Sequence, residues 1–170
     1  MKPLISFNAN PNEPSWRAVN DGVMGGRSSG GPEITNGRLR FEGTLSLENN
    51  GGFSSVRTVG KTFDLSQASA ITLKVRGDGR TYQLRLATDA RFRGIAVSYG
   101  SSFATVADAW TEVRLPLAEL KPTIRGMALD GPPLDAAHVR EIGLLIGDKR
   151  EGAFWLEVDW IGVEAVESLE

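Results

Sequence analysis

The stretch WRAVNDGVMGGRSSG, residues 16–30, contains one carboxylate and four glycines. Such a stretch can be a phosphate-binding loop, a calcium-binding loop or a turn between two strands. A Walker-type phosphate loop needs Gly-Lys-Ser/Thr and a following helix, whereas Arg27 follows Gly26 here. A calcium loop needs several oxygen ligands at close spacing, and Asn20, Asp21 and backbone carbonyls are the supply. In a strand–turn–strand, glycine permits positive φ and close backbone approach. The missing lysine and the single carboxylate favour this last alternative.

Side chains for catalysis are scarce. The chain has no cysteine, which excludes a thiol nucleophile and thiolate zinc sites, and it has one histidine, His138. His138 lies in a helix-like segment with no catalytic motif around it, which favours a surface or capping role. Glu157 and Asp159 share one strand face, as a glycosidase pair would, but solvent-facing charges explain them better. The sequence predicts no catalytic residue and no cofactor, and it assigns no metal ligand.

A second glycine-rich stretch, ENNGGFSSVR, covers residues 48–57. Its Asn-Asn-Gly-Gly segment predicts a turn, after which Phe53, Ser55 and Arg57 alternate onto one strand face. Arg57 then either faces a ligand groove or pairs with a glutamate on a neighbouring strand, and the pairing is favoured. The four tryptophans, at positions 16, 110, 155 and 160, offer possible sugar-stacking platforms, but burial in the core is the default for tryptophan.

Alternation with period two dominates the elements that must position these residues. In residues 38–48, Leu39, Phe41, Leu45 and Leu47 fall on one face. Residues 70–88 contain the pattern twice, with Leu73 and Leu84 pointing inward and GDGR between them as a hairpin turn. The same reasoning predicts further strands over residues 53–58, 94–98, 102–106, 111–115, 141–146 and 153–163.

Helical patterning is weak in comparison. Residues 134–141 are expected to form two turns behind Asp135, and residues 116–122 at most one turn. A doubly wound α/β fold needs a helix after most strands, so it is excluded. The sequence therefore predicts an all-β protein, an antiparallel β-sandwich or barrel of about eight to ten strands.

Composition limits the class of protein further. A length of 170 residues fits one domain, expected to cover residues 1–170. The net charge of −2 provides no field that attracts nucleic acid, so no nucleic-acid partner is expected. The densest apolar run, residues 142–147, is far too short to span a membrane, and the first residues lack the apolar region of a signal peptide. These features predict a cytoplasmic protein without a membrane span.

With these residues laid out, the chain resembles the complex I intermediate-associated protein 30 family. The resemblance rests on WRAVNDGVMGGRSSG, FEGTLSLENNGGFSSVR, VRGDGRTYQLRL and GLLIGDKREGAFWLEVDWI, in this order between Trp16 and Ile161. It implies a galactose-binding-like jelly roll. Mitochondrial members of the family act as assembly chaperones for respiratory complex I and are not subunits of the finished enzyme. This chain has no transit-like leader, so a stand-alone bacterial member is expected.

The resemblance implies a non-catalytic protein-interaction module whose partners are complex I subunits or assembly intermediates. The alternative is a module that binds carbohydrate or another small ligand, since sugar-binding relatives of this fold place ligands at loop ends or on a concave sheet face. By that analogy the candidate binding residues are Asn20, Asp21, Met24, Asn50, Arg57 and Arg85. For Asp21 a structural role is favoured, in which its carboxylate accepts hydrogen bonds from amides of residues 22–26.

Overall fold

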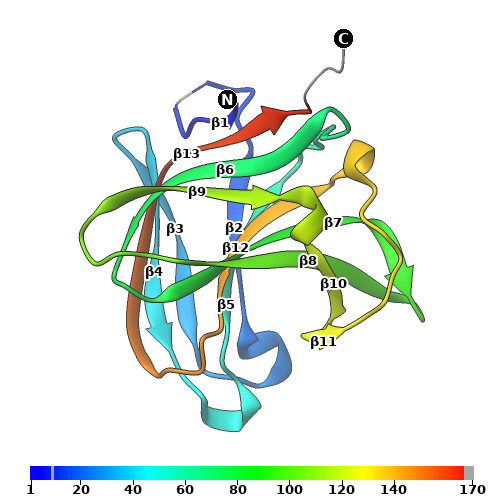
Figure 1. Cartoon of the computed structure of the whole chain (residues 1–170). Helices are drawn as coiled ribbons and strands as arrows, with labels where there is room; N and C mark the ends of the chain where they lie inside the picture. The colour runs from blue at the N-terminus through cyan, green and yellow to red at the C-terminus, as the bar shows by residue number, and fades with distance from the viewer. Residues whose placement is uncertain (9, 167–170) are drawn as a thin grey trace.

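The computed structural model describes residues 1–8 and 10–166, and for Val23, Met24 and Asn50 it describes the backbone alone. The described residues form two antiparallel sheets. The six-stranded sheet has the order β3-β4-β13-β6-β9, with β1 also paired to β13, and the seven-stranded sheet has the order β11-β10-β8-β7-β12-β5-β2 (Figure 1). The strands are β1 (Lys2–Ile5), β2 (Ser15–Asn20), β3 (Ser29–Thr35), β4 (Arg38–Leu45), β5 (Ser54–Val59), β6 (Ala68–Gly77), β7 (Thr81–Phe92), β8 (Ile95–Ala104), β9 (Trp110–Pro116), β10 (Lys121–Ile124), β11 (Met127–Ala128), β12 (Glu141–Ile146) and β13 (Gly152–Ala165).

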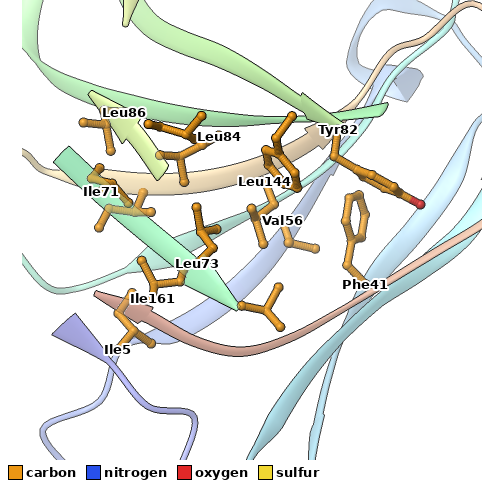
Figure 2. Packing of buried hydrophobic residues seen from close by; sticks show 14 of the residues in the cluster. Ile5, Phe41, Val56, Ile71, Leu73, Tyr82, Leu84, Leu86, Leu144 and Ile161 are labelled. Carbon is orange, nitrogen blue, oxygen red and sulfur yellow. The ribbon is translucent and has the colours of Figure 1, made fainter. Parts of the chain in front are cut away.

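The core lies between the two sheets. Leu73 and Ile161 come from the six-stranded sheet and face Val56, Leu84 and Leu144 of the seven-stranded sheet, and all five are fully buried (Figure 2). The alternating pattern of each strand supplies these inward side chains, while its other residues form the two outer faces. The predicted all-β antiparallel sandwich is confirmed.

The connection between β6 and β7 differs from the prediction. Leu73 and Leu84 are buried as expected, but the GDGR segment is not a hairpin, because β6 and β7 belong to different sheets. The turn crosses from one sheet to the other, and Arg80 anchors it there with bidentate hydrogen bonds to Asp148 at 2.9 and 2.6 Å. A crossing and a hairpin both join two alternating strands through a tight turn, so the pattern alone did not separate them.

The prediction of two strands over residues 94–98 and 102–106 is wrong as well, because the single strand β8 runs without a break from Ile95 to Ala104. Gly100 lies between the two predicted ranges, and it pairs with Arg85 inside the sheet. The number of strands in the described residues is thirteen rather than eight to ten. The surplus comes from the short strands β1, β10 and β11 and from β3, none of which the sequence had indicated by residue range.

Two smaller expectations also fail. Residues 134–141 form only the single 3₁₀ turn η4 (Ala136–His138), because the backbone of Val139 exchanges hydrogen bonds with Phe63 at 2.7 and 3.1 Å. Leu47 lies beyond the end of β4 and is exposed rather than inward. Residues 116–122 contain one 3₁₀ turn, η3 (Leu117–Glu119), as expected. None of the helical turns in the described residues has the length or apolar character of a membrane-crossing helix.

Candidate functional site

Asp21 joins the two glycine-rich stretches at one end of the sandwich. It begins the 3₁₀ turn η1 (Asp21–Met24) directly after β2, opposite to the end that carries β1 (Figure 1). Asp21 is 1% exposed, and its Oδ1 accepts a hydrogen bond from the amide of Ser28 at 2.9 Å. Oδ2 accepts from the amides of Gly52 and Phe53 at 2.7 and 3.3 Å. The donors are therefore Ser28, Gly52 and Phe53, and not the amides of residues 22–26 that the sequence suggested.

Two glycines allow the backbone to close around this carboxylate. A Cβ on Gly26 would come within 2.5 Å of Asp21 Oδ1, and a Cβ on Gly51 within 2.6 Å of Oδ2. Burial alone raises the pKa of Asp21, but hydrogen bonds from Ser28, Gly52 and Phe53 outweigh it and lower the pKa below its usual value. The glycines in both stretches thus have a structural reason, which is close packing around a buried anion.

Asn20 ties the two sheets together beside Asp21. Its Nδ2 donates to the carbonyl of Gly30 in β3 at 3.1 Å, and its Oδ1 accepts from Ser54 Oγ in β5 at 2.5 Å. Asn20 and Asp21 are therefore engaged within the chain. Met24 lies in η1 and Asn50 in the 3₁₀ turn η2 (Glu48–Asn50), and their side chains lie outside the described residues.

Arg57 and Arg85 lie elsewhere, on the outer face of the seven-stranded sheet. Their neighbours in the core are Val56, Leu84 and Leu86, so the two arginines point to the opposite side. Strand pairing places them in one continuous row, which we call the cation row. Across the sheet from β2 to β10, the row contains Arg17, Arg57, Gly143, Arg85, Gly100 and Lys121.

Arg85 is held in the row by neutral side chains. Its Nε donates to Ser98 Oγ at 2.9 Å, one terminal nitrogen donates to Gln83 Oε1 at 2.8 Å, and the other donates to Thr123 Oγ1 at 2.5 Å. The guanidinium lies across Gly100, where a Cβ would come within 2.6 Å of its Cζ. Burial and then the positive charge of Arg57 lower the pKa of Arg85, and no carboxylate of the described residues offsets them.

Arg57 and Arg17 share one carboxylate, that of Glu141. Glu141 lies 3.4 Å from a terminal nitrogen of Arg17 and 3.7 Å from one of Arg57, while Arg57 Nε donates to Ser55 Oγ at 3.2 Å. Burial lowers the pKa of Arg57, Glu141 raises it, and Arg17 lowers it again, with a net decrease. The expected pairing of Arg57 with a glutamate of a neighbouring strand exists, but the distance is long.

The rows on either side of the cation row are polar or aliphatic. They contain Ser15, Val59, Glu141, Ala87, Ser98 and Thr123 on one side, and Val19, Ser55, Leu145, Gln83 and Ser102 on the other. These rows hold no aromatic side chain and only one carboxylate. An open pocket of about 290 Å³, lined in part by Arg17, Thr58 and Glu141, adjoins the row near β2. The outer face of the seven-stranded sheet is therefore polar, and it is open near β2.

The outer face of the six-stranded sheet is organised differently. Arg76 lies between Trp110 and Trp155, 5.2 and 5.9 Å from their ring centres, and Arg40 stacks on Trp155 at 4.8 Å. Glu157 binds both arginines, at 3.2 Å from Arg40 and 2.6 Å from Arg76. These indole faces are occupied by guanidinium groups, which argues against the sugar-stacking role considered for them.

The remaining candidates for chemistry have ordinary surroundings. Asp159 contacts Arg38 at 3.4 Å, so neither carboxylate of the pair with Glu157 is free of an arginine. His138 is exposed and contacts Asp135 at 2.9 Å, in agreement with a surface or capping role. Within the described part of the chain, no group of three His, Asp or Glu side chains is arranged to hold a metal ion.

The cation row was only half visible in the sequence. Arg57 and Arg85 were candidates there, whereas Arg17, Lys121 and Glu141 were missed. Alternation assigns each of these residues to the outer side of its own strand, but their alignment depends on the register between strands far apart in sequence.

These features define an antiparallel jelly-roll β-sandwich with a polar outer face on its seven-stranded sheet. A solved structure of the family 11 carbohydrate-binding module from Clostridium thermocellum, in complex with a β-1,3-1,4-mixed-linked tetrasaccharide, has this fold, with a TM-score of 0.73 and 15% identity. The similarity covers 98% of this chain and 97% of that one. The chain itself belongs to the complex I intermediate-associated protein 30 family, which matches residues 5–158.

Two curated relatives that the chain matches are named as mitochondrial proteins. The mouse complex I intermediate-associated protein 30 is 28% identical over 169 residues, covering 87% of this chain and 51% of the mouse protein. The probable Caenorhabditis elegans counterpart is 27% identical over 138 residues, covering 76% of this chain and 39% of that protein. The chain thus spans about half the length of the mouse relative and less of the nematode one.

Proposed function

We propose that this protein is a non-catalytic interaction module that assists the assembly of a multi-subunit complex, with subunits or intermediates of respiratory complex I as its partners. The names of its relatives support this class of function. The structural observation that carries the proposal is the cation row, in which the half-buried Arg57 and Arg85 share an open face with the single carboxylate of Glu141. One carboxylate does not balance the basic side chains of this face, and Arg85 has none, so the face suits a partner that brings negative charge.

The test is affinity isolation of the tagged protein from cells of its natural host, followed by mass spectrometry. Complex I subunits should be enriched with the wild-type protein and reduced with the double variant Arg57→Gln/Arg85→Gln. Arg114→Gln is the matched control, because Arg114 is an exposed arginine on the other sheet, paired with Glu164. Absence of complex I subunits from the wild-type sample would refute the proposal. Fractionation of the same cells tests the expected cytoplasmic location.

Carbohydrate binding is the second candidate, favoured by the fold of the family 11 module. The outer face of the seven-stranded sheet offers Gln83, Ser98, Thr123 and Arg85 as hydrogen-bonding groups. Its central rows lack the aromatic platform on which a neutral sugar ring stacks, which ranks this candidate below the first. Affinity electrophoresis in mixed-linked β-glucan decides the matter: retardation that Arg85→Gln abolishes would favour carbohydrate binding over a protein partner.

A further inference from the structure

The charges on the two outer faces are distributed unequally. On the six-stranded sheet each arginine contacts at least one carboxylate, and these arginines are Arg38, Arg40, Arg76 and Arg114. The cation row and its two flanking rows contain four basic side chains and one carboxylate, Glu141. The whole chain is acidic, with a net charge of −2, so this local excess does not follow from composition.

Arg85 is fixed in position and still has donors to offer. A guanidinium group has five N–H donors, and the hydrogen bonds to Ser98, Gln83 and Thr123 use three of them. Gly100 leaves the space in which this side chain lies flat on the sheet. A partly desolvated cation without a counter-charge is unfavourable, and an arriving carboxylate would remove that penalty through charge-assisted hydrogen bonds.

We propose that the cation row binds an acidic segment of a partner protein through carboxylates about 10 Å apart. The spacing follows from the sheet, because neighbouring strands lie about 4.8 Å apart and Arg57 and Arg85 are separated by two strand spacings. Lys121 lies two spacings beyond Arg85. A segment in the polyproline II conformation has three residues per turn and advances about 3.1 Å per residue, so acidic residues at every third position lie on one side, about 9 Å apart, and match the row. This inference rests on the proposed function as a protein-interaction module.

A partner protein fits the row better than a small anion does. The cations are spread along a line of five strand spacings, about 24 Å, whereas a single phosphate needs donors that converge on it. A densely charged polymer such as nucleic acid would also meet the overall negative charge of the chain. A segment with a few separated carboxylates places negative charge only opposite the basic side chains of the cation row.

The experiment is fluorescence anisotropy with the purified full chain and labelled peptides at about 0.01 M salt, where the Debye length is ~30 Å. The probe has glutamate at every third position between glycines. One control peptide carries the same number of glutamates side by side, and a second carries glutamine in their place. We expect the spaced peptide to bind at least fivefold more tightly than the clustered one, and the glutamine peptide not to bind.

Protein variants complete the test. The double variant Arg57→Gln/Arg85→Gln should weaken binding of the spaced peptide at least tenfold, and Arg114→Gln should change it less than twofold. Thermal melting confirms that each variant is folded, and Arg85→Lys provides a further variant that keeps the charge without the planar fork. Unaltered binding by the double variant, equal binding of the two acidic peptides, or tighter binding of an acidic polysaccharide at the same row would overturn the inference. Failure here with complex I subunits still captured would leave the proposed function standing.

Discussion

Replacing Asp21 with alanine removes the acceptor for three backbone amides at once. The amide of Ser28 is buried with it, and those of Gly52 and Phe53 are partly buried, with the Phe53 contact the longest at 3.3 Å. A buried donor left without a partner costs about 1–3 kcal/mol. If the full penalty applies to the buried amide of Ser28 and part of it to those of Gly52 and Phe53, Asp21→Ala should lower the free energy of unfolding by about 3 kcal/mol. For a chain of this length that corresponds to a decrease in Tm of about 6–12 °C.

The assay is urea denaturation followed by tryptophan fluorescence, with thermal melting as a second measurement. Asp21→Asn keeps the shape and one acceptor oxygen, so its loss of stability should be smaller. Asp159→Ala is the control, because this carboxylate forms a surface pair with Arg38 at 3.4 Å and should contribute less than about 1 kcal/mol. An unchanged melt for Asp21→Ala, together with a lost partner in the affinity isolation, would refute the structural role and make the loop a binding surface.

The pH dependence of the same variant provides an independent check. The folded pKa of Asp21 lies below its unfolded value of about 3.9, so the carboxylate stabilises the fold fully above that pH. Its contribution is lost as the pH falls from about 4 through the folded pKa. The difference in unfolding free energy between wild type and Asp21→Ala should therefore be constant near neutral pH and shrink below about pH 4. A difference that grows on acidification would contradict the sign of the shift.

Four further outcomes are expected from stability measurements. Gly51→Ala should destabilise the chain by at least about 1 kcal/mol, because its Cβ would collide with the Asp21 carboxylate. Gly37→Ala is the comparison: Gly37 lies in open space at a positive φ of 73°, so a loss of stability there reports backbone strain without a collision. Leu84→Ala should cost about 2–5 kcal/mol in urea melts, whereas Lys74→Ala, on an outer face, should stay within about 0.5 kcal/mol, and equal effects would show the assigned faces to be wrong. Asp148→Ala should cost about 3–5 kcal/mol because the buried Arg80 guanidinium loses its carboxylate partner, and an unchanged melt would show that the inter-sheet turn does not depend on this ion pair. Unfolding should be one cooperative transition monitored by fluorescence and circular dichroism alike, as expected if residues 1–170 form a single domain; two separated transitions would contradict this.

The sequence predicted which side chains of a strand point into the core, but it did not predict which strands lie next to one another. Period-two alternation placed Leu73 and Leu84 in the core and Arg57 and Arg85 outside it, because side-chain direction is a local property of a strand. It did not show that the GDGR segment crosses between sheets, since that depends on which strands pair over long distances. Gly100 shows the same limit: its reason is the Arg85 side chain above it, which belongs to the neighbouring strand.

The glycine-rich stretches illustrate how far local reasoning reached. The strand–turn–strand reading of residues 16–30 correctly made Asp21 an acceptor of backbone hydrogen bonds, because a turn rich in glycine needs a side-chain anchor. The donors came from elsewhere, and two of the three belong to the second stretch, at Gly52 and Phe53. Each stretch is incomplete alone, and only the folded chain brings them together.

The lowered pKa values of Asp21 and Arg85 have opposite meanings for the charge that each side chain carries. For Asp21 the pKa is lowered, which for a carboxyl group means that its surroundings favour the charged form. For Arg85 the pKa is also lowered, which for a guanidinium means that its surroundings disfavour the charge it carries. Both side chains are well ordered by hydrogen bonds, so order alone does not distinguish them. Asp21 has its compensating dipoles inside the chain, and Arg57 has the carboxylate of Glu141 at 3.7 Å. Arg85 has no carboxylate partner among the described residues, and under our proposal an acidic segment of a partner protein supplies one.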